Sequence, residues 1–263
     1  MKILPIALNT FRENVRDKVL YNLVIFAFLL IASSVILGDL SIGQEAKIIV
    51  DLGLASISLV GGLIAVFIGI GLVYKEIDRR TLYNIVSKPV ERYQFLLGKF
   101  VGLLLTLAVN VAIMTAGMYG ALLYLTGSWH GAYLNLLPAV MLVFAELVLL
   151  TSIALFFSTF STPALSAVFT LSLWFAGHFN SDFKHLSALT DSTGLNFLCN
   201  LFYYLLPNFS NFKYLSGENI IRTAGYFRGP EVMAFVAAVT YGAVYTFGIV
   251  LCAAFIFQRR DFR

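Results

Sequence analysis

The stretch that decides the fold is residues 74–100, YKEIDRRTLYNIVSKPVERYQFLLGKF, a charged segment between two long apolar runs. Its basic residues outnumber its acidic ones: Lys75, Arg79, Arg80, Lys88, Arg92 and Lys99 against Glu76, Asp78 and Glu91. Short loops rich in Lys and Arg stay on the cytoplasmic side of membrane spans. The segment therefore predicts a cytoplasmic loop between two membrane-spanning helices, where a partner on that side can meet it.

Composition indicates a membrane protein. Hydrophobic residues make up 59% of the 263 residues and charged residues 12%, and the mean hydropathy is +0.86. A soluble domain has about 25% charged residues. We therefore expect an all-α integral membrane protein, a single transmembrane domain over residues 1–263. The net charge of +4 is small and unevenly placed, so it indicates topology and not nucleic-acid binding.

Six apolar runs predict six transmembrane helices. They lie at residues 19–37, 48–74, 101–125, 138–158, 164–179 and 232–257. Lys and Arg gather at both chain ends and in the 74–100 segment, which six spans place on one face. We therefore expect a multi-pass protein of the cytoplasmic (inner) membrane with both termini in the cytoplasm. Cys199 and Cys252 fall in an outer segment and in a span, so no disulfide is expected.

Residues 1–18 predict an N-terminal interfacial helix and not a cleavable signal peptide. Apolar residues recur at helical spacing on one side, and polar residues cover the other. The two sets are Leu4, Leu8, Phe11 and Val15, and Asn9, Arg12, Glu13 and Arg16. Such a helix would lie on the inner leaflet and lead into the first span; a short solvated helix is the alternative.

Residues 180–231 form the largest predicted piece outside the spans and are expected on the outer side. Within them, residues 195–206 (LNFLCNLFYYLL) are too short to cross a bilayer and end before Pro207, which predicts a short re-entrant or interfacial outer helix before the last span. Tyr203 and Tyr204 suit the headgroup level. This helix either plugs the outer face of the bundle or gates a pathway.

Small residues four positions apart predict close helix contacts, because small side chains let helix backbones approach in lipid. The ladders are Gly61, Ala65 and Gly69; Ala112, Ala116 and Gly120; and Ala234, Ala238 and Gly242.

Catalytic and nucleotide-binding motifs are absent from the sequence. Its only Gly-Lys pair, Gly98-Lys99, is followed by Phe100 and lacks the upstream glycine of a P-loop, and no GxSxG, HExxH or CxxC occurs. His130, His178 and His185 lie at or beyond the outer ends of predicted spans. A soft-metal site with Cys199 is an alternative, but without close ligand spacing ordinary interfacial histidines are favoured and no metal is expected.

Glu146 is the one carboxylate well inside a predicted span. A buried charge there is expensive, so we expect it to be protonated, paired with a group such as Asn110, or facing an aqueous cavity. Glu146 and Asn110, with Tyr203 and Tyr204 on the outer side, are the candidates for a pathway or gate. A plain hydrogen bond between helices is the alternative.

The 74–100 segment resembles the first cytoplasmic loop of ABC-2-type transporter permeases. The residues that carry the resemblance are Glu76, Arg79, Arg80, Thr81, Ile85, Ser87, Lys88, Pro89, Val90, Arg92, Phe95, Leu96, Gly98 and Lys99. The likeness is greatest to the branch involved in maturation of multicopper enzymes such as nitrous oxide reductase. It extends along the chain through FRENVRDKVLY at 11–21, Thr162-Pro163, YYLLPNFSNF at 203–212 and FQRRDF at 257–262.

The resemblance implies that residues 75–99 form a coupling helix that docks on a separate ABC ATPase subunit. The docking residues would be Glu76, Arg79, Arg80, Thr81, Ser87, Lys88, Pro89 and Arg92. It further implies a homodimer of this chain with two ATPases, acting as an exporter. ATP and Mg²⁺ would bind the partner, and this chain, which is not itself an enzyme, would bind no cofactor. Arginine suits such docking because its guanidinium binds carboxylates with two hydrogen bonds.

Other readings stay open. The basic residues of the loop can serve topology alone. An integral membrane enzyme acting on lipid or peptide bonds would use Glu146 or an outer histidine as acid or base, but titratable residues are sparse. An ion-coupled carrier would be expected to have more intramembrane charge and broken helices. Membrane lipid is an expected partner and a periplasmic accessory protein an open one, while the residues indicate no substrate.

Overall fold

The computed structural model describes residues 3–40, 44–78, 91–127, 131–180, 186, 193–213 and 230–259, and none of these residues is in a β-strand. The α-helices are α1 (Ile3–Val15), α2 (Lys18–Asp39), α3 (Glu45–Asp78), α5 (Arg92–Thr126), α6 (Leu137–Ser158), α7 (Pro163–His178), α9 (Thr193–Leu205) and α11 (Pro230–Arg259). Two 3₁₀ helices, η1 (Gly131–Leu136) and η2 (Phe209–Lys213), precede α6 and follow α9. In the described part of the chain the expected all-α architecture is confirmed.

Five of the described helices are long and apolar enough to cross a membrane: α2, α3, α5, α6 and α11. Each covers one of the predicted spans, so a multi-pass membrane protein is confirmed. The sixth predicted span, residues 164–179, forms α7, which has 16 residues. At 1.5 Å per residue this is about 24 Å, short of a hydrocarbon core of about 30 Å. Six complete crossings therefore remain a prediction.

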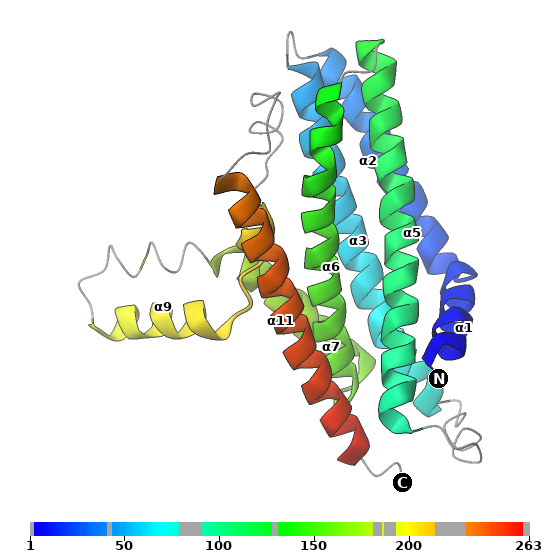
Figure 1. Ribbon diagram of the computed structural model, residues 1–263, viewed down its shortest axis with the longest axis vertical. Coiled ribbons are helices and arrows are strands. Elements are labelled where there is room, and N and C mark those ends of the chain that lie inside the picture. The colour runs from blue at the N-terminus through cyan, green and yellow to red at the C-terminus, as the bar shows by residue number, and fades with distance from the viewer. Residues whose placement is uncertain are drawn as a thin grey trace.

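The central helices of the bundle are α3 and α6. In their most apolar stretches 67% of the residues are buried, against 22% in α2 and α11. Figure 1 shows α2, α3, α5 and α6 side by side, with α11 leaning against α6. α7 packs on both α6 and α3. The space between α3, α6 and α7 is therefore bordered by the two most buried of the five long apolar helices.

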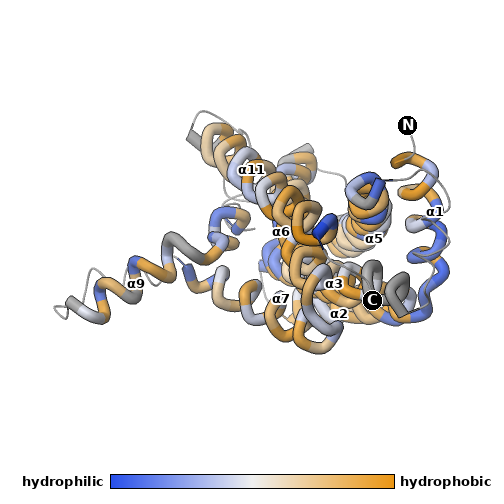
Figure 2. The backbone as a smooth tube through the Cα atoms, turned by 90° about the horizontal axis from the view of Figure 1, so that it is seen from below, coloured by the Kyte–Doolittle hydropathy of each residue, from blue (hydrophilic) through white to orange (hydrophobic). Residues whose placement is uncertain are grey.

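The outer helix predicted at residues 195–206 forms as α9. It projects sideways from the bundle in both views (Figures 1 and 2). Its C-terminal end is tied to the end of α7, because the side-chain amide of the buried Asn180 donates to the carbonyl oxygens of Tyr203 and Leu206, each at 3.2 Å.

The stretch between α3 and α5 is shorter than the predicted coupling segment, residues 75–99, because both helices extend into that segment. Residues 75–78 are the last turn of α3, and Arg92–Lys99 are the first two turns of α5. These ends lie at the same end of the bundle as the end of α11 (Figure 1). Residues 79–90, which hold most of the predicted docking residues, lie outside the described residues.

The helix predicted at the N-terminus forms as α1, but it packs through a different face from the apolar stripe. Leu4 and Leu8 are 63% and 43% exposed, whereas Ala7, Thr10 and Asn14 are buried against the bundle. α1 packs on α5 (Figures 1 and 2). The physical reason is that apolar surface gains little by leaving lipid, so small and hydrogen-bonding residues make the contact.

Two polar contacts secure α1 to α5. The Lys99 ammonium lies 3.5 Å from the Glu13 carboxylate and is almost fully buried. The Asn14 amide donates to the Thr106 hydroxyl at 3.3 Å. Lys99, one of the basic residues of the 74–100 segment, is therefore engaged within the protein.

Close backbone approach between α1 and α5 requires glycine. A Cβ at Gly102 would lie 2.6 Å from the Ala7 carbonyl oxygen and 2.6 Å from Thr10 Cβ, and one at Gly98 would lie 2.7 Å from Ile6 Cβ. A Cβ at Gly120, a member of a predicted ladder, meets nothing within 4 Å. The contact on α5 is thus made by glycines that the sequence analysis had not paired.

We predict that Gly102→Ala lowers the free energy of unfolding by about 1–3 kcal/mol, because the added carbon collides with the α1 backbone. Gly120→Ala is the matched control; it leaves stability unchanged or raises it by up to about 1 kcal/mol, since alanine favours the helix. The measurements are thermal unfolding in detergent and the rate of tryptic cleavage after Arg12 and Arg16. Equal stability and cleavage rates in the two variants would contradict the α1–α5 packing.

Candidate functional site

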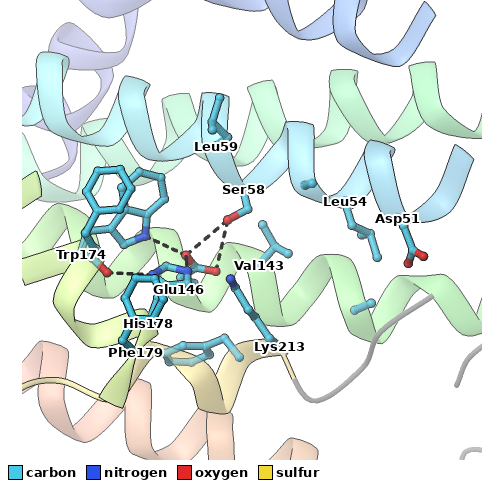
Figure 3. Close-up of a pocket in the computed structure, with 14 residues that line it drawn as sticks. Asp51, Leu54, Ser58, Leu59, Val143, Glu146, Trp174, His178, Phe179 and Lys213 are labelled. Carbon is cyan, nitrogen blue, oxygen red and sulfur yellow. Dashed lines mark hydrogen bonds and ion pairs between the residues drawn. The ribbon is translucent and has the colours of Figure 1, made fainter. Parts of the chain in front are cut away.

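A cavity of about 520 Å³ lies between α3, α6, α7 and η2 (Figure 3). Its volume is typical of sites that hold small molecules. Its ionisable lining residues are Asp51, Glu146, His178 and Lys213, and most of the remaining lining is apolar: Leu54, Leu59, Val143, Trp174, Phe175, Phe179 and Phe212. The cavity thus combines four ionisable side chains with a mostly apolar lining.

The carboxylate of Glu146 is the polar centre of the cavity wall and is only 1% exposed. Trp174 Nε1 donates to Oε1 at 2.9 Å, and the Ser58 hydroxyl lies 3.3 and 3.4 Å from Oε1 and Oε2. His178 Nε2 lies 3.4 Å from Oε1. Donors from α3 and α7 thus converge on one carboxylate of α6, which satisfies the requirement that a buried charge be paired and hydrogen-bonded.

Helical spacing places two of these partners together. Trp174 and His178 are four residues apart on α7 and therefore share one face. His178 Nδ1 lies 2.7 Å from the Trp174 carbonyl oxygen, which fixes the imidazole so that Nε2 points to Glu146. The other side of the imidazole stacks on Phe209, with ring centres 5.7 Å apart and planes 10° from parallel. The ring is thus held from two directions.

The chain before and within η2 covers the end of α7 because Gly177 has no side chain. A Cβ at Gly177 would collide with the Pro207 carbonyl oxygen and the Phe209 ring. From the other side, the Tyr241 hydroxyl on α11 accepts a hydrogen bond from the Asn208 backbone N–H at 2.9 Å. η2 is therefore held between α7 and α11, where it contributes Phe212 and Lys213 to the cavity.

Lys213 extends from η2 toward the Glu146 carboxylate, and Asp51 lies farther along α3 (Figure 3). The Lys213 side chain is exposed, in contrast to Glu146. The cationic Lys213 thus lies at the accessible side of the cavity, and the acidic Glu146 lies in its buried wall.

Of the four residues predicted for a pathway or gate, Glu146 lines the cavity, and its role in a pathway stays a prediction. Glu146 is buried and makes hydrogen bonds to neighbouring helices, which was the alternative to a pathway role. Asn110, suggested as its partner, is buried on α5 but donates at 2.7 Å to the Thr106 carbonyl of its own helix. Tyr203 does not line the cavity, and the Tyr204 side chain lies outside the described set. The pairing of Glu146 with Asn110 is therefore wrong.

The predicted docking residues are not brought into this site. Glu76 lies in the last turn of α3 and Arg92 opens α5, but their side chains are outside the described set. The other six predicted docking residues lie within 79–90. Their role stays a prediction.

Sequence reasoning missed Ser58, Trp174 and His178. His178 was counted as an interfacial histidine because it ends a span. The i, i+4 pair Trp174 and His178 near the end of an apolar helix was the available indication. Nothing in the sequence showed that α7 would place this pair beside Glu146, because that contact joins residues 28 positions apart.

The arrangement differs from that of a hydrolase. Ser58, Glu146 and His178 have the side-chain types of a catalytic triad, but there the histidine lies between the nucleophile and the acid. Here Glu146 lies between the other two, so the Ser58 hydroxyl contacts the carboxylate and not the histidine. Among the described residues, no group of three His, Cys, Asp or Glu side chains is placed to hold a metal ion.

We predict that Glu146→Leu lowers the free energy of unfolding by about 1–3 kcal/mol, because the indole N–H and the Ser58 hydroxyl lose their acceptor. Glu146→Gln should cost less, since its amide oxygen still accepts from Trp174. Ser56→Ala is the control, because the Ser56 hydroxyl donates to Leu52 of its own helix. The test is thermal unfolding of each variant; a Leu variant as stable as the control would refute the carboxylate-centred network.

Comparison with known proteins agrees with this architecture. No curated protein matches the chain. The family model described as ABC-2 family transporter protein matches residues 4–262, nearly the full chain. Permeases of this family are membrane transport subunits that generally work with an ABC ATPase subunit. The chain therefore belongs to the ABC-2 transporter family.

Proposed function

We propose that this chain is the membrane-spanning subunit of an ATP-driven exporter, which acts as a homodimer and docks a separate ATPase through residues 75–99. The observation that carries the proposal is the family match over residues 4–262 of a chain whose basic segment joins α3 to α5. The integral membrane enzyme is disfavoured by the order of Ser58, Glu146 and His178. An ion-coupled carrier remains the second reading.

α3 supplies a mechanical link from the proposed docking segment to the cavity. It is one helix of 34 residues, with Asp78 at the docking end and Ser58 at the Glu146 carboxylate. The two positions are about 30 Å apart along the helix axis. A rigid-body shift of α3 would therefore move Ser58 and Asp51 relative to α6, which changes the cavity. Such shifts of packed helices are an established form of switching.

The docking chemistry would rest on arginine. Arg79, Arg80 and Arg92 can each hold a carboxylate of the ATPase with two parallel hydrogen bonds. Pro89 lacks a backbone donor and has a fixed φ, which suits the first turn of a short coupling helix. Lys99 is excluded from this surface because it is buried against Glu13.

Export, dimerisation and the cargo rest on the resemblance of the 74–100 segment. A pathway would run between two permease copies, and α9 with the segment before η2 would cover its outer side. The branch resembled is that of multicopper enzyme maturation, in which a periplasmic accessory protein would be a further partner. ATP and Mg²⁺ would bind the ATPase subunit.

We predict that the triple variant Arg79→Glu, Arg80→Glu, Arg92→Glu loses the ATPase partner, because reversed charges repel the acidic groups that the arginines would hold. The variant should still insert in the membrane, since other cytoplasmic basic residues remain. The measurements are co-purification with the proposed ATPase subunit and ATP hydrolysis by the complex.

The matched control reverses three basic residues at the chain end: Arg259, Arg260 and Arg263. Unchanged co-purification and hydrolysis in the docking variant would refute the docking surface. Equal loss in both variants would show that general charge, and not this segment, binds the ATPase.

Topology has its own test. In a background lacking Cys199 and Cys252, single cysteines at Lys88 and Arg263 should react with a membrane-impermeant maleimide only from the cytoplasmic side, and one at Ser192 only from outside. Ser192 and Lys88 should differ because an odd number of crossings is expected between them. Labelling of both from the same side would mean that α7 does not complete a crossing.

A further inference from the structure

The buried polar groups of the cavity wall are already engaged within the protein. The Trp174 indole N–H and the Ser58 hydroxyl both donate to the Glu146 carboxylate. The His178 ring is held at the Trp174 carbonyl oxygen, 2.7 Å from Nδ1, and Asp51 also has an interaction partner. A buried polar group needs a polar ligand only where the protein leaves it without a partner. This wall therefore does not require a polar ligand.

The rest of the lining is apolar, and part of it faces outward. On α3, Leu59 is 46% exposed, and Ala55, one turn earlier, is exposed as well. On α7, Phe175 and Phe179 are 62% and 57% exposed. All four side chains line the cavity. Because α3 is one of the helices long and apolar enough to cross a membrane, this rim between α3 and α7 faces the hydrocarbon of the bilayer.

The cavity has a closed apolar end and a charged end. At the closed end α3 and α7 meet, since a Cβ at Gly62 would lie only 2.6 Å from Cη2 of Trp174. At the other end lie Asp51, near the start of α3, and the exposed Lys213. Asp51 and Gly62 are about 16 Å apart along the helix axis. The cavity is thus an elongated space that changes from polar to apolar along α3.

We propose that this cavity binds one acyl chain of a membrane phospholipid, which enters sideways from the bilayer between α3 and α7. The methyl end of the chain lies toward Trp174, and the ester end lies toward Lys213, whose long side chain keeps its ammonium at the headgroups.

The gain in such binding is packing. Apolar walls without neighbouring atoms lose dispersion contacts, and an apolar chain in a volume of about 520 Å³ restores them. The chain leaves the hydrogen bonds of Glu146 intact. Binding does not depend on the ATPase, so its failure is distinct from failure of the docking proposal.

The test uses the full-length chain in lipid nanodiscs of phosphatidylcholine, with and without bromine atoms on the acyl chains. Bromine quenches indole fluorescence at short range. The chain has two tryptophans, so in a Trp129→Phe background the emission comes from Trp174, which is 6% exposed. Brominated phosphatidylcholine should quench this emission, because the bound chain lies against the indole.

Filling the cavity should remove the quenching. Ala55→Phe should abolish most of it, and Ala55→Leu should abolish a smaller part, because the larger side chains occupy the space of the acyl chain. The Leu variant keeps the proposal testable if the Phe variant misfolds, which thermal unfolding would reveal. Ala32→Phe is the matched control, the same change at an exposed position of α2 outside the cavity. It should leave the quenching unchanged.

Three results would overturn the proposal. Equal quenching in the unmodified chain and both Ala55 variants would mean that bromine reaches Trp174 only from the surrounding bilayer. A loss in Ala32→Phe as large as that in Ala55→Phe would show a general change in lipid contact. Quenching by an added brominated fatty acid but not by brominated phosphatidylcholine would assign the cavity to a free fatty acid and not to a phospholipid.

Discussion

The rest of the structure depends on how one buried carboxylate is satisfied. In lipid, a charged or polar group without partners is costly, while apolar contacts between helices contribute little. Glu146 meets this constraint with the hydroxyl of Ser58, the indole of Trp174 and the imidazole of His178. These donors come from the helices on either side of α6. The carboxylate therefore fixes the relative positions of α3, α6 and α7, and the cavity is the space that these positions leave open.

Two further sets of contacts lie at opposite ends of the unit formed by α3, α6 and α7. At one end, Gly98 and Gly102 let α1 lie on α5, and Lys99 pairs with Glu13, so α1 and the start of α5 form one rigid corner. At the other end, Gly177 lets the segment before η2 lie on α7 and complete the cavity wall. α3 joins the two ends as one continuous helix. Motion at the basic segment would thus reach the cavity without an intervening hinge.

Helices were predictable from this sequence because an apolar run in a membrane protein has one outcome, a helix with all its backbone groups paired. The predicted spans and the short helix before Pro207 accordingly match the observed helices, apart from an early start of α5. Contacts between helices were not predictable. Small-residue spacing suggested Gly120, yet Gly102 makes the close approach, and the apolar stripe through Leu4 and Leu8 faces away from the bundle. Glu146 was identified because charge in a span demands a partner, but its partners come from α3 and α7, whose placement is set by the whole fold.

The most direct test of the account is a double-mutant cycle between Glu146→Gln and His178→Gln, measured as free energy of unfolding in detergent. If the carboxylate joins α6 to α7 through His178, the double variant should be less destabilised than the sum of the single variants by about 1 kcal/mol or more. Effects that add to within about 0.5 kcal/mol would show that the two side chains do not interact and that the cavity is not organised around Glu146.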